Sequence, residues 1–246
     1  MPLPSPAALA AQGRRYLEAI VAIDSMSDER SDTVPSTPGQ AALADFVGGI
    51  FADLGARVER DAFGNVLAWI PGRGSLATAP TLAMLVHLDT AEGSEALPEL
   101  VLHPAWDGGP LRYPGNPDLH VDLATYPTTV DFLGQDLLHG SGLAPFGLDD
   151  KLGLAHMLSL AWMLAEDAER PHRPLVLVGR PDEEIGREEA LLGLADRLAA
   201  AGVTSGYTID GFLPWEVNVA NFNAAMGTLR FASRPGRLGT APRRVI

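Results

Sequence analysis

The chain has 246 residues, of which 46% are hydrophobic and 20% are charged, so it can bury a core of ordinary size. Its formal net charge of −13 argues against a nucleic-acid partner and an anionic membrane surface, because both attract basic proteins. It contains no cysteine, so any metal must be held by His, Asp, Glu or water. It carries neither a signal peptide nor a membrane-spanning apolar run, which predicts a cytoplasmic protein.

The N-terminal part is predicted to form two helices and a hairpin. Helical periodicity covers residues 7–23, and a second helix is expected over 38–54, where Gly55 ends it. Residues 57–61 and 66–70 are typical of two strands joined by a tight turn. These predicted helices and strands carry the first apolar residues of the core.

The rest of the chain alternates strands and helices. The expected elements are a strand at 81–86, a helix at 150–165, a strand at 174–178, a helix at 188–201, a strand at 207–209 and two more strands within 216–231. Between them, residues 91–140 are rich in Pro and Gly, which is typical of a long functional or covering loop. The alternation indicates an α/β fold with a mainly parallel sheet flanked by helices.

Four short motifs carry acidic or histidine side chains. They are His87-Leu88-Asp89-Thr90, Gly147-Leu148-Asp149-Asp150-Lys151, Pro181-Asp182-Glu183-Glu184-Ile185-Gly186 and Tyr207-Thr208-Ile209-Asp210-Gly211. Three of them directly follow a predicted buried strand, where an open α/β sheet binds its ligands. Imidazole together with several carboxylates suits a pair of catalytic divalent metals.

The first two motifs each have a second explanation when considered alone. His87 and Asp89 alternate along an extended segment, so Asp89 can accept the free ring N–H of His87, although a surface pair would have the same sequence. Asp149 stands where a helix begins, and it is either a helix cap or a carboxylate that bridges two metals.

The last two motifs are equally ambiguous. Glu183 and Glu184 suit the start of a helix, or they divide into one metal ligand and one general base on opposite sides of an extended loop. Asp210 with Gly211 is common in turns. His156 is expected to be structural, whereas the loop histidines stay open as ligands; these are His103, His120 and His139.

In this order the motifs resemble those of the M20 metallopeptidases, and within them those of the peptidase T group of tripeptide aminopeptidases. The family patterns are H-V-D-T, G-A-D-D-K-x-G, T-P-D-E-E-V-G, Y-T-V-D-G and E-N-F-N-A-A, which correspond here to residues 87–90, 147–153, 180–186, 207–211 and 220–225. The segment V-P-S-T-P-G-Q at 34–40 also resembles a family motif, V-P-S-T-x-G-Q. The resemblance extends from the first helix to about Phe231.

The resemblance implies a zinc-dependent aminopeptidase that removes the N-terminal residue from short peptides such as tripeptides. It implies that one zinc ion is bound by His87, Asp149 and Asp210. Asp149 would bridge to a second zinc ion, which Glu184 would also bind. Two zinc ions and a short peptide are therefore the expected cofactors and substrate.

The resemblance also implies roles for two further acidic residues. Glu183 would be the general base that takes a proton from the water between the metals, and Asp89 would orient the imidazole of His87. The family has a cis peptide bond after its bridging Asp, which here is the bond between Asp149 and Asp150.

The chain departs from the family pattern in several places. The family's second zinc takes a His from a C-terminal segment, but no His follows His172 here, and Arg180 and Arg237 replace a family Thr and His. Residues 1–226 are expected to be a partial catalytic domain, and residues 227–246 the beginning of the inserted domain through which the family forms homodimers. The alternative is a truncated, inactive relative that at most binds metal or peptide.

Overall fold

The computed structural model describes residues 4–211, 216–220 and 227. The chain divides into two compact units, Met1–Asp210 and Gly211–Ile246. The few described residues of the second unit form no helix or strand. All helices and strands of the described chain therefore belong to the first unit.

A five-stranded sheet forms the centre of this unit, with the strand order β1-β2-β8-β3-β9. The strands are β1 (Arg57–Arg60), β2 (Val66–Ile70), β3 (Leu82–His87), β8 (Leu175–Arg180) and β9 (Ser205–Thr208). Strand β3 pairs in parallel with β8 and β9, whereas β2 pairs antiparallel with β1 and β8. Only β2 therefore runs against the other four strands, and the predicted mainly parallel α/β sheet is confirmed.

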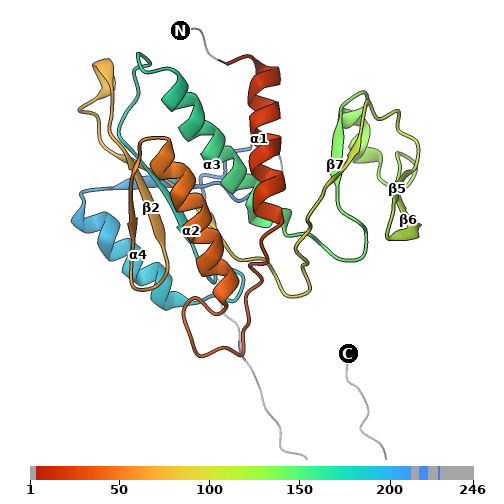
Figure 1. The fold of residues 1–246 in the computed structure, drawn as a ribbon, viewed down its shortest axis with the longest axis horizontal. Helices are drawn as coiled ribbons and strands as arrows, with labels where there is room; N and C mark the ends of the chain where they lie inside the picture. Colours follow the sequence, from red (N-terminus) through yellow and green to blue (C-terminus); the bar gives the residue numbers. More distant parts are fainter. Residues whose placement is uncertain (1–3, 212–215, 221–226, 228–246) are drawn as a thin grey trace, which may run out of the picture. The chain divides into compact units, whose positions relative to one another are not determined.

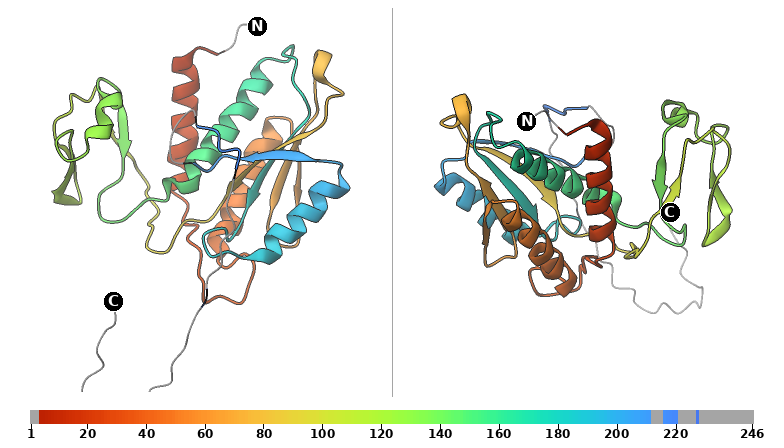
Figure 2. Two further views of the ribbon diagram at one scale, coloured as in Figure 1. Left: turned by 180° about the vertical axis from the view of Figure 1, so that it is seen from behind. Right: turned by 45° about the horizontal axis from the view of Figure 1, so that its top comes forward.

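Helices cover both faces of the sheet (Figure 1). Helices α1 (Pro6–Val21), α2 (Pro38–Asp53) and α3 (Leu148–Glu166) lie on one face, and α4 (Glu188–Ala200) lies on the other (Figure 2). The predicted helices are confirmed to within two residues at each end. Gly55 follows α2 with a φ of 87°, a backbone conformation that glycine adopts without steric cost.

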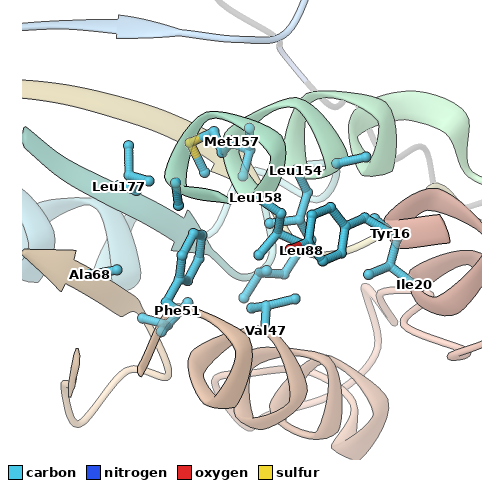
Figure 3. Close-up of a cluster of buried hydrophobic side chains, with 14 of the residues drawn as sticks. Tyr16, Ile20, Val47, Phe51, Ala68, Leu88, Leu154, Met157, Leu158 and Leu177 are labelled. Carbon is cyan, nitrogen blue, oxygen red and sulfur yellow. The ribbon is translucent and has the colours of Figure 1, made fainter. Parts of the chain in front are cut away.

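Strand β8 shows how the sheet is buried between the two helical layers. Its residues Leu175 and Leu177 point into the core beneath α1, α2 and α3, where Phe51 and Leu158 are fully buried (Figure 3). The alternate residues of β8 pack toward α4 instead. Burial on both faces explains the continuous apolar run of this strand. The polar residues of this region therefore lie beyond the end of the strand rather than within it.

The predicted long loop at 91–140 contains more regular structure than expected. Strands β4 (Val101–His103) and β7 (Leu137–His139) pair with each other, as do β5 (Leu111–Tyr113) and β6 (Asn116–Val121). Short 3-10 helices occupy Gly74–Leu76 and Pro127–Phe132. The sequence predicted a functional or covering loop here, and its paired strands were not predicted because this Pro- and Gly-rich segment shows only weak periodicity.

Two other expectations concern the C-terminal region. The strands expected within 216–231 do not occur at residues 216–220, and most of the remainder lies outside the described residues. The domain boundary expected at residue 226 also falls outside them. None of the helices in the described part of the chain has the length and apolar character that a membrane span requires.

Candidate metal centre

Three of the predicted ligands meet at the carboxyl ends of the parallel strands. His87 is the last residue of β3, Asp210 follows β9, and Asp149 lies in the first turn of α3. Their ligand atoms all lie within 4.8 Å of one another. The Nε2 atom of His87 is 2.9 Å from Asp149 Oδ1 and 3.8 Å from Asp210 Oδ2. This is the only such cluster among the described residues.

The start of α3 directs Asp149 toward His87. Gly147 precedes the helix in the left-handed conformation with a φ of 69°, and Asp149 has a non-helical ψ of 111°. The side chain of Asp149 is 68% exposed, and its Oδ1 lies against the imidazole of His87. The bond between Asp149 and Asp150 is cis, as the resemblance implies. Asp149 thus faces the cluster, and its role as a metal ligand stays a prediction.

The other ring nitrogen of His87 faces Asp89. Nδ1 lies 2.8 Å from the backbone carbonyl oxygen of Asp89 and 3.5 Å from its carboxylate Oδ1. The carbonyl can therefore accept the Nδ1 hydrogen, which leaves the Nε2 lone pair directed at Asp149 and Asp210. The closest acceptor is the backbone oxygen rather than the carboxylate expected from the sequence.

The carboxylate of Asp89 instead holds the loop that carries the two glutamates. It is fully buried and accepts hydrogen bonds from the backbone N–H groups of Glu183 at 2.9 Å and Glu184 at 3.1 Å. Burial by itself raises the pKa of Asp89, but hydrogen bonds from His87 and from these two N–H groups lower it overall. Asp89 thus connects the end of β3 to the acidic loop after β8.

Glu183 and Glu184 lie in a turn, not in the extended loop predicted from the sequence. The residue before them, Asp182, has a positive φ of 56°. Because the segment is not extended, the expectation that the adjacent side chains of Glu183 and Glu184 point to opposite sides does not apply here. Burial raises the pKa of Glu184, and the charges of Asp149 and Asp89 raise it further, so Glu184 lies within electrostatic range of the cluster.

The cluster has an excess of negative charge. Burial tends to lower the pKa of His87, but the carboxylates around it, first Asp89 and then Asp149, raise it to about 10. Burial and the neighbouring Asp210 raise the pKa of Asp150 to about 8. Burial and Asp149 also raise the pKa of Asp210. A bound cation would stabilise the ionised form of these carboxylates and so offset the effect of their mutual repulsion.

Asp150 and Lys151 are buried next to the cluster, and the sequence motif that contains them did not predict a role for either. Asp150 accepts a hydrogen bond from the backbone N–H of His87 at 3.3 Å, and Lys151 donates to the carbonyl of Ile23 at 2.7 Å. Both are almost fully buried. Their signal in the sequence is a pair of charged residues in the first turn of an otherwise apolar helix.

The histidines of the predicted loop do not join the cluster. His103, His120 and His139 lie in strands β4, β6 and β7. His139 is buried, its Nδ1 lies 2.8 Å from the carbonyl oxygen of Gly140, and its ring packs edge-on against Tyr113. Among the described residues, His87 is the only histidine in the candidate metal centre.

Gly153 brings α3 close to the end of β9, and we expect Gly153→Ala to destabilise the protein. A Cβ atom there would overlap a carboxylate oxygen of Asp150 and the carbonyl oxygen of Ile209. Overpacking of this kind costs about 1–3 kcal/mol of unfolding free energy, measurable by urea denaturation. The matched control is Gly49→Ala in α2, where no atom lies within 4 Å of the added Cβ and a gain of about 0.5–1 kcal/mol is expected. Equal effects at both sites would contradict the close approach.

Two solved structures with a similar fold are a tripeptidase and a dipeptidase. A tripeptidase from Staphylococcus aureus superposes with a TM-score of 0.51 at 20% identity, over 82% of this chain and 43% of that one. Human carnosine dipeptidase 1 gives a TM-score of 0.51 at 19% identity, over 86% of this chain and 42% of that one. The chain therefore shares the fold of the matched parts of these two proteins, and its candidate metal centre lies at the carboxyl ends of the parallel strands.

The sequence comparisons identify a more specific relationship. Peptidase T from Desulfitobacterium hafniense strain Y51 is 31% identical over 231 residues, which cover 92% of this chain and 54% of that protein. Peptidase T from Aeromonas hydrophila is 32% identical over 224 residues, which cover 90% and 53%. No family model matches the chain. The resemblance to the M20 metallopeptidases, and within them to peptidase T, is confirmed, and the chain spans about half the length of these relatives.

Proposed function

We propose that this chain provides the metal-binding part of a zinc-dependent aminopeptidase that removes the N-terminal residue from tripeptides. The observation that carries the proposal is the cluster of His87, Asp149 and Asp210 at the carboxyl ends of the parallel strands. It coincides with the motifs that resemble the family pattern, in a chain related to peptidase T over 92% of its length. The cytoplasmic location expected from the sequence is part of the same proposal.

The donor set is compatible with zinc. One imidazole and two carboxylates are ligands that zinc accepts, and the excess negative charge of the cluster favours a divalent cation. His87, Asp149 and Asp210 would hold the first ion, and Glu184 with Asp149 would hold the second. Three ligand atoms of the first group lie within 4.8 Å of one another, whereas only Asp149 and Glu184 are proposed for the second site, so we expect the first ion to bind more tightly.

The chemistry divides between the metal and the side chains of the chain. Zinc, when bound, supplies a Lewis acid that polarises the scissile carbonyl group and lowers the pKa of water. Glu183 takes the proton from the attacking water and transfers it to the leaving amine. The Asp89 carboxylate holds the backbone of Glu183 and Glu184, while its carbonyl oxygen fixes the tautomer of His87.

The proposal is tested by zinc titration and peptide hydrolysis with the purified 246-residue chain. We expect one tightly bound zinc ion and zinc-dependent release of the N-terminal residue of trialanine. Zinc binding without hydrolysis would favour the alternative of an inactive metal-binding relative. A stably folded chain without zinc affinity would overturn the metal centre itself.

Zinc binding is expected to strengthen as the pH rises. The folded pKa of His87 is about 10 against about 6.5 in an unfolded chain, so its contribution to stability is complete below about pH 6.5 and is lost as the pH rises through 10. Asp150, with a folded pKa of about 8, acts in the same direction. Zinc must displace the proton of His87, so its affinity should rise about tenfold per pH unit while that one proton is released.

Two measurements check this pH dependence. Urea denaturation in the presence of a chelator should show a smaller unfolding free energy at pH 9 than at pH 6. Calorimetric zinc titration in two buffers of different ionisation enthalpy should show proton release. A zinc affinity that is constant between pH 6 and 9 would contradict the proposal that His87 must lose a proton before it binds zinc.

A further inference from the structure

A buried hydrogen-bond network connects the N-terminal segment V-P-S-T-P-G-Q to the turn that carries the two glutamates. Its centre is Asp182, whose residue exposure is 0%. The Asp182 carboxylate accepts hydrogen bonds from the backbone N–H of Ser36 at 2.8 Å, from the Ser36 hydroxyl, and from the Gln40 side-chain amide at 2.7 Å. In return, the backbone N–H of Asp182 donates to Gln40 Oε1 at 3.0 Å.

The network satisfies every side-chain group that it buries. Gln40 is also fully buried, and both its oxygen and its nitrogen are used, because the oxygen accepts from Asp182 and the nitrogen donates to it. Buried carboxylates and amides are costly unless paired in this way. The network therefore fixes the position of Asp182 relative to the start of α2, although Asp182 and Gln40 are 142 residues apart in the sequence.

Asp182 is also the first residue of the turn that presents Glu183 and Glu184. It has a left-handed backbone with a φ of 56°, which is uncommon for a residue other than glycine. Its carbonyl oxygen accepts the N–H of Arg187 at 3.1 Å, which closes the turn. The next two N–H groups bind the carboxylate of Asp89. The turn is thus held from two directions, by Asp89 at the metal centre and by Ser36 and Gln40 at α2.

We propose that Ser36, Gln40 and Asp182 are positioning residues that set the location of Glu183 and Glu184 relative to the cluster of His87, Asp149 and Asp210. The inference rests on the proposed function for the roles of the two glutamates, but not for the geometry of the turn. A general base and a metal ligand must be held within a fraction of an ångström to act. None of the network's printed hydrogen bonds involves a side chain of the cluster.

The test exchanges the partners of one hydrogen bond. Gln40→Glu places a second acceptor against the Asp182 carboxylate, and Asp182→Asn places a second donor against the amide of Gln40. The double variant carrying both changes restores the pairing, because the new amide at 182 can donate to the new carboxylate at 40 and still accept from Ser36. The control is Val47→Ala, a fully buried residue in the core beneath the same helix.

Two readouts are compared in the metal-free and zinc-loaded chain. The first is amide hydrogen exchange of Glu183 and Glu184, which needs neither metal nor activity. The second is kcat for tripeptide hydrolysis. Each single variant should accelerate exchange at these two amides and lower kcat by about 100-fold, and the double variant should recover both. Val47→Ala should lower the melting temperature without changing either readout relative to wild type.

Each outcome bears on the proposal. Single variants that lose stability while exchange at Glu183 and Glu184 and kcat stay at wild-type values would overturn it, since the network would then only stabilise the fold. If the singles do not fold, the milder Ser36→Ala keeps the backbone N–H donor, and unchanged exchange in that variant would also overturn it. If wild type proves inactive, the proposed function fails, but the exchange readout still decides whether the network positions the turn.

Discussion

His87→Ala is expected to remove zinc binding at the first site almost completely. His87 supplies the only imidazole of the cluster in the described part of the chain, and its side chain is 2% exposed, so no other side chain can move into its place at low cost. Structural zinc sites gain about 10–16 kcal/mol from roughly four ligands, so the loss of one ligand should weaken binding by about 100-fold or more. Competitive titration with a chromophoric chelator measures this change directly.

The control for this experiment is His156→Ala. His156 lies on the exposed side of α3, the helix that also carries Asp149, but it is not part of the cluster. Its removal should leave the zinc dissociation constant unchanged within about twofold. Wild-type zinc affinity in His87→Ala would mean that the ion binds elsewhere on the chain.

Glu183→Gln is expected to lower kcat by about 10²–10⁴-fold, the range associated with loss of a general base. Glutamine has nearly the same shape, and the backbone N–H of residue 183 would still bind Asp89, so the turn should be preserved. Zinc affinity should therefore stay within a few-fold of wild type. Steady-state hydrolysis of a tripeptide together with zinc titration separates these two effects.

The matched control is Glu188→Gln, which changes an exposed glutamate in the first turn of α4. It should leave kcat and zinc binding unchanged. The same measurements on Glu183→Gln and Glu184→Gln would also reveal if the roles proposed for the two glutamates are reversed. Loss of zinc binding in Glu183→Gln, with a catalytic defect and normal zinc affinity in Glu184→Gln, would make Glu183 the ligand and Glu184 the base.

The sequence was sufficient to predict the sheet and its polar edge, for a physical reason. Strands β3 and β8 are covered by helices on both faces, so their residues form continuous apolar runs that stand out from the surrounding chain. The motifs that end these two runs must then lie at one edge of a parallel sheet, so the sequence could place His87 near Glu183 and Glu184. Asp210 follows β9, whose four residues are exposed, and its placement depended on the motif Tyr207-Thr208-Ile209-Asp210-Gly211.

Other features of the site depend on contacts between distant parts of the chain. The turn at Glu183 and Glu184 is shaped by bonds to Asp89 and to the start of α2, and a single sequence does not reveal such partners. The hydrogen-bond acceptor of His87 was predicted to be a side chain because residue alternation describes side chains only, whereas the backbone carbonyl of Asp89 lies closer.

The exposures of the cluster side chains imply an order of events when an ion arrives or leaves. The imidazole of His87 is 2% exposed and fixed by its neighbours, whereas the carboxylates of Asp149 and Asp210 are 68% and 39% exposed. A fixed donor loses little rotational freedom on binding, while an exposed carboxylate must give up several rotamers. An arriving ion would meet the two exposed carboxylates first and the buried imidazole, which must release its proton, last, so the rate of metal exchange would depend on carboxylate motion and on deprotonation of His87.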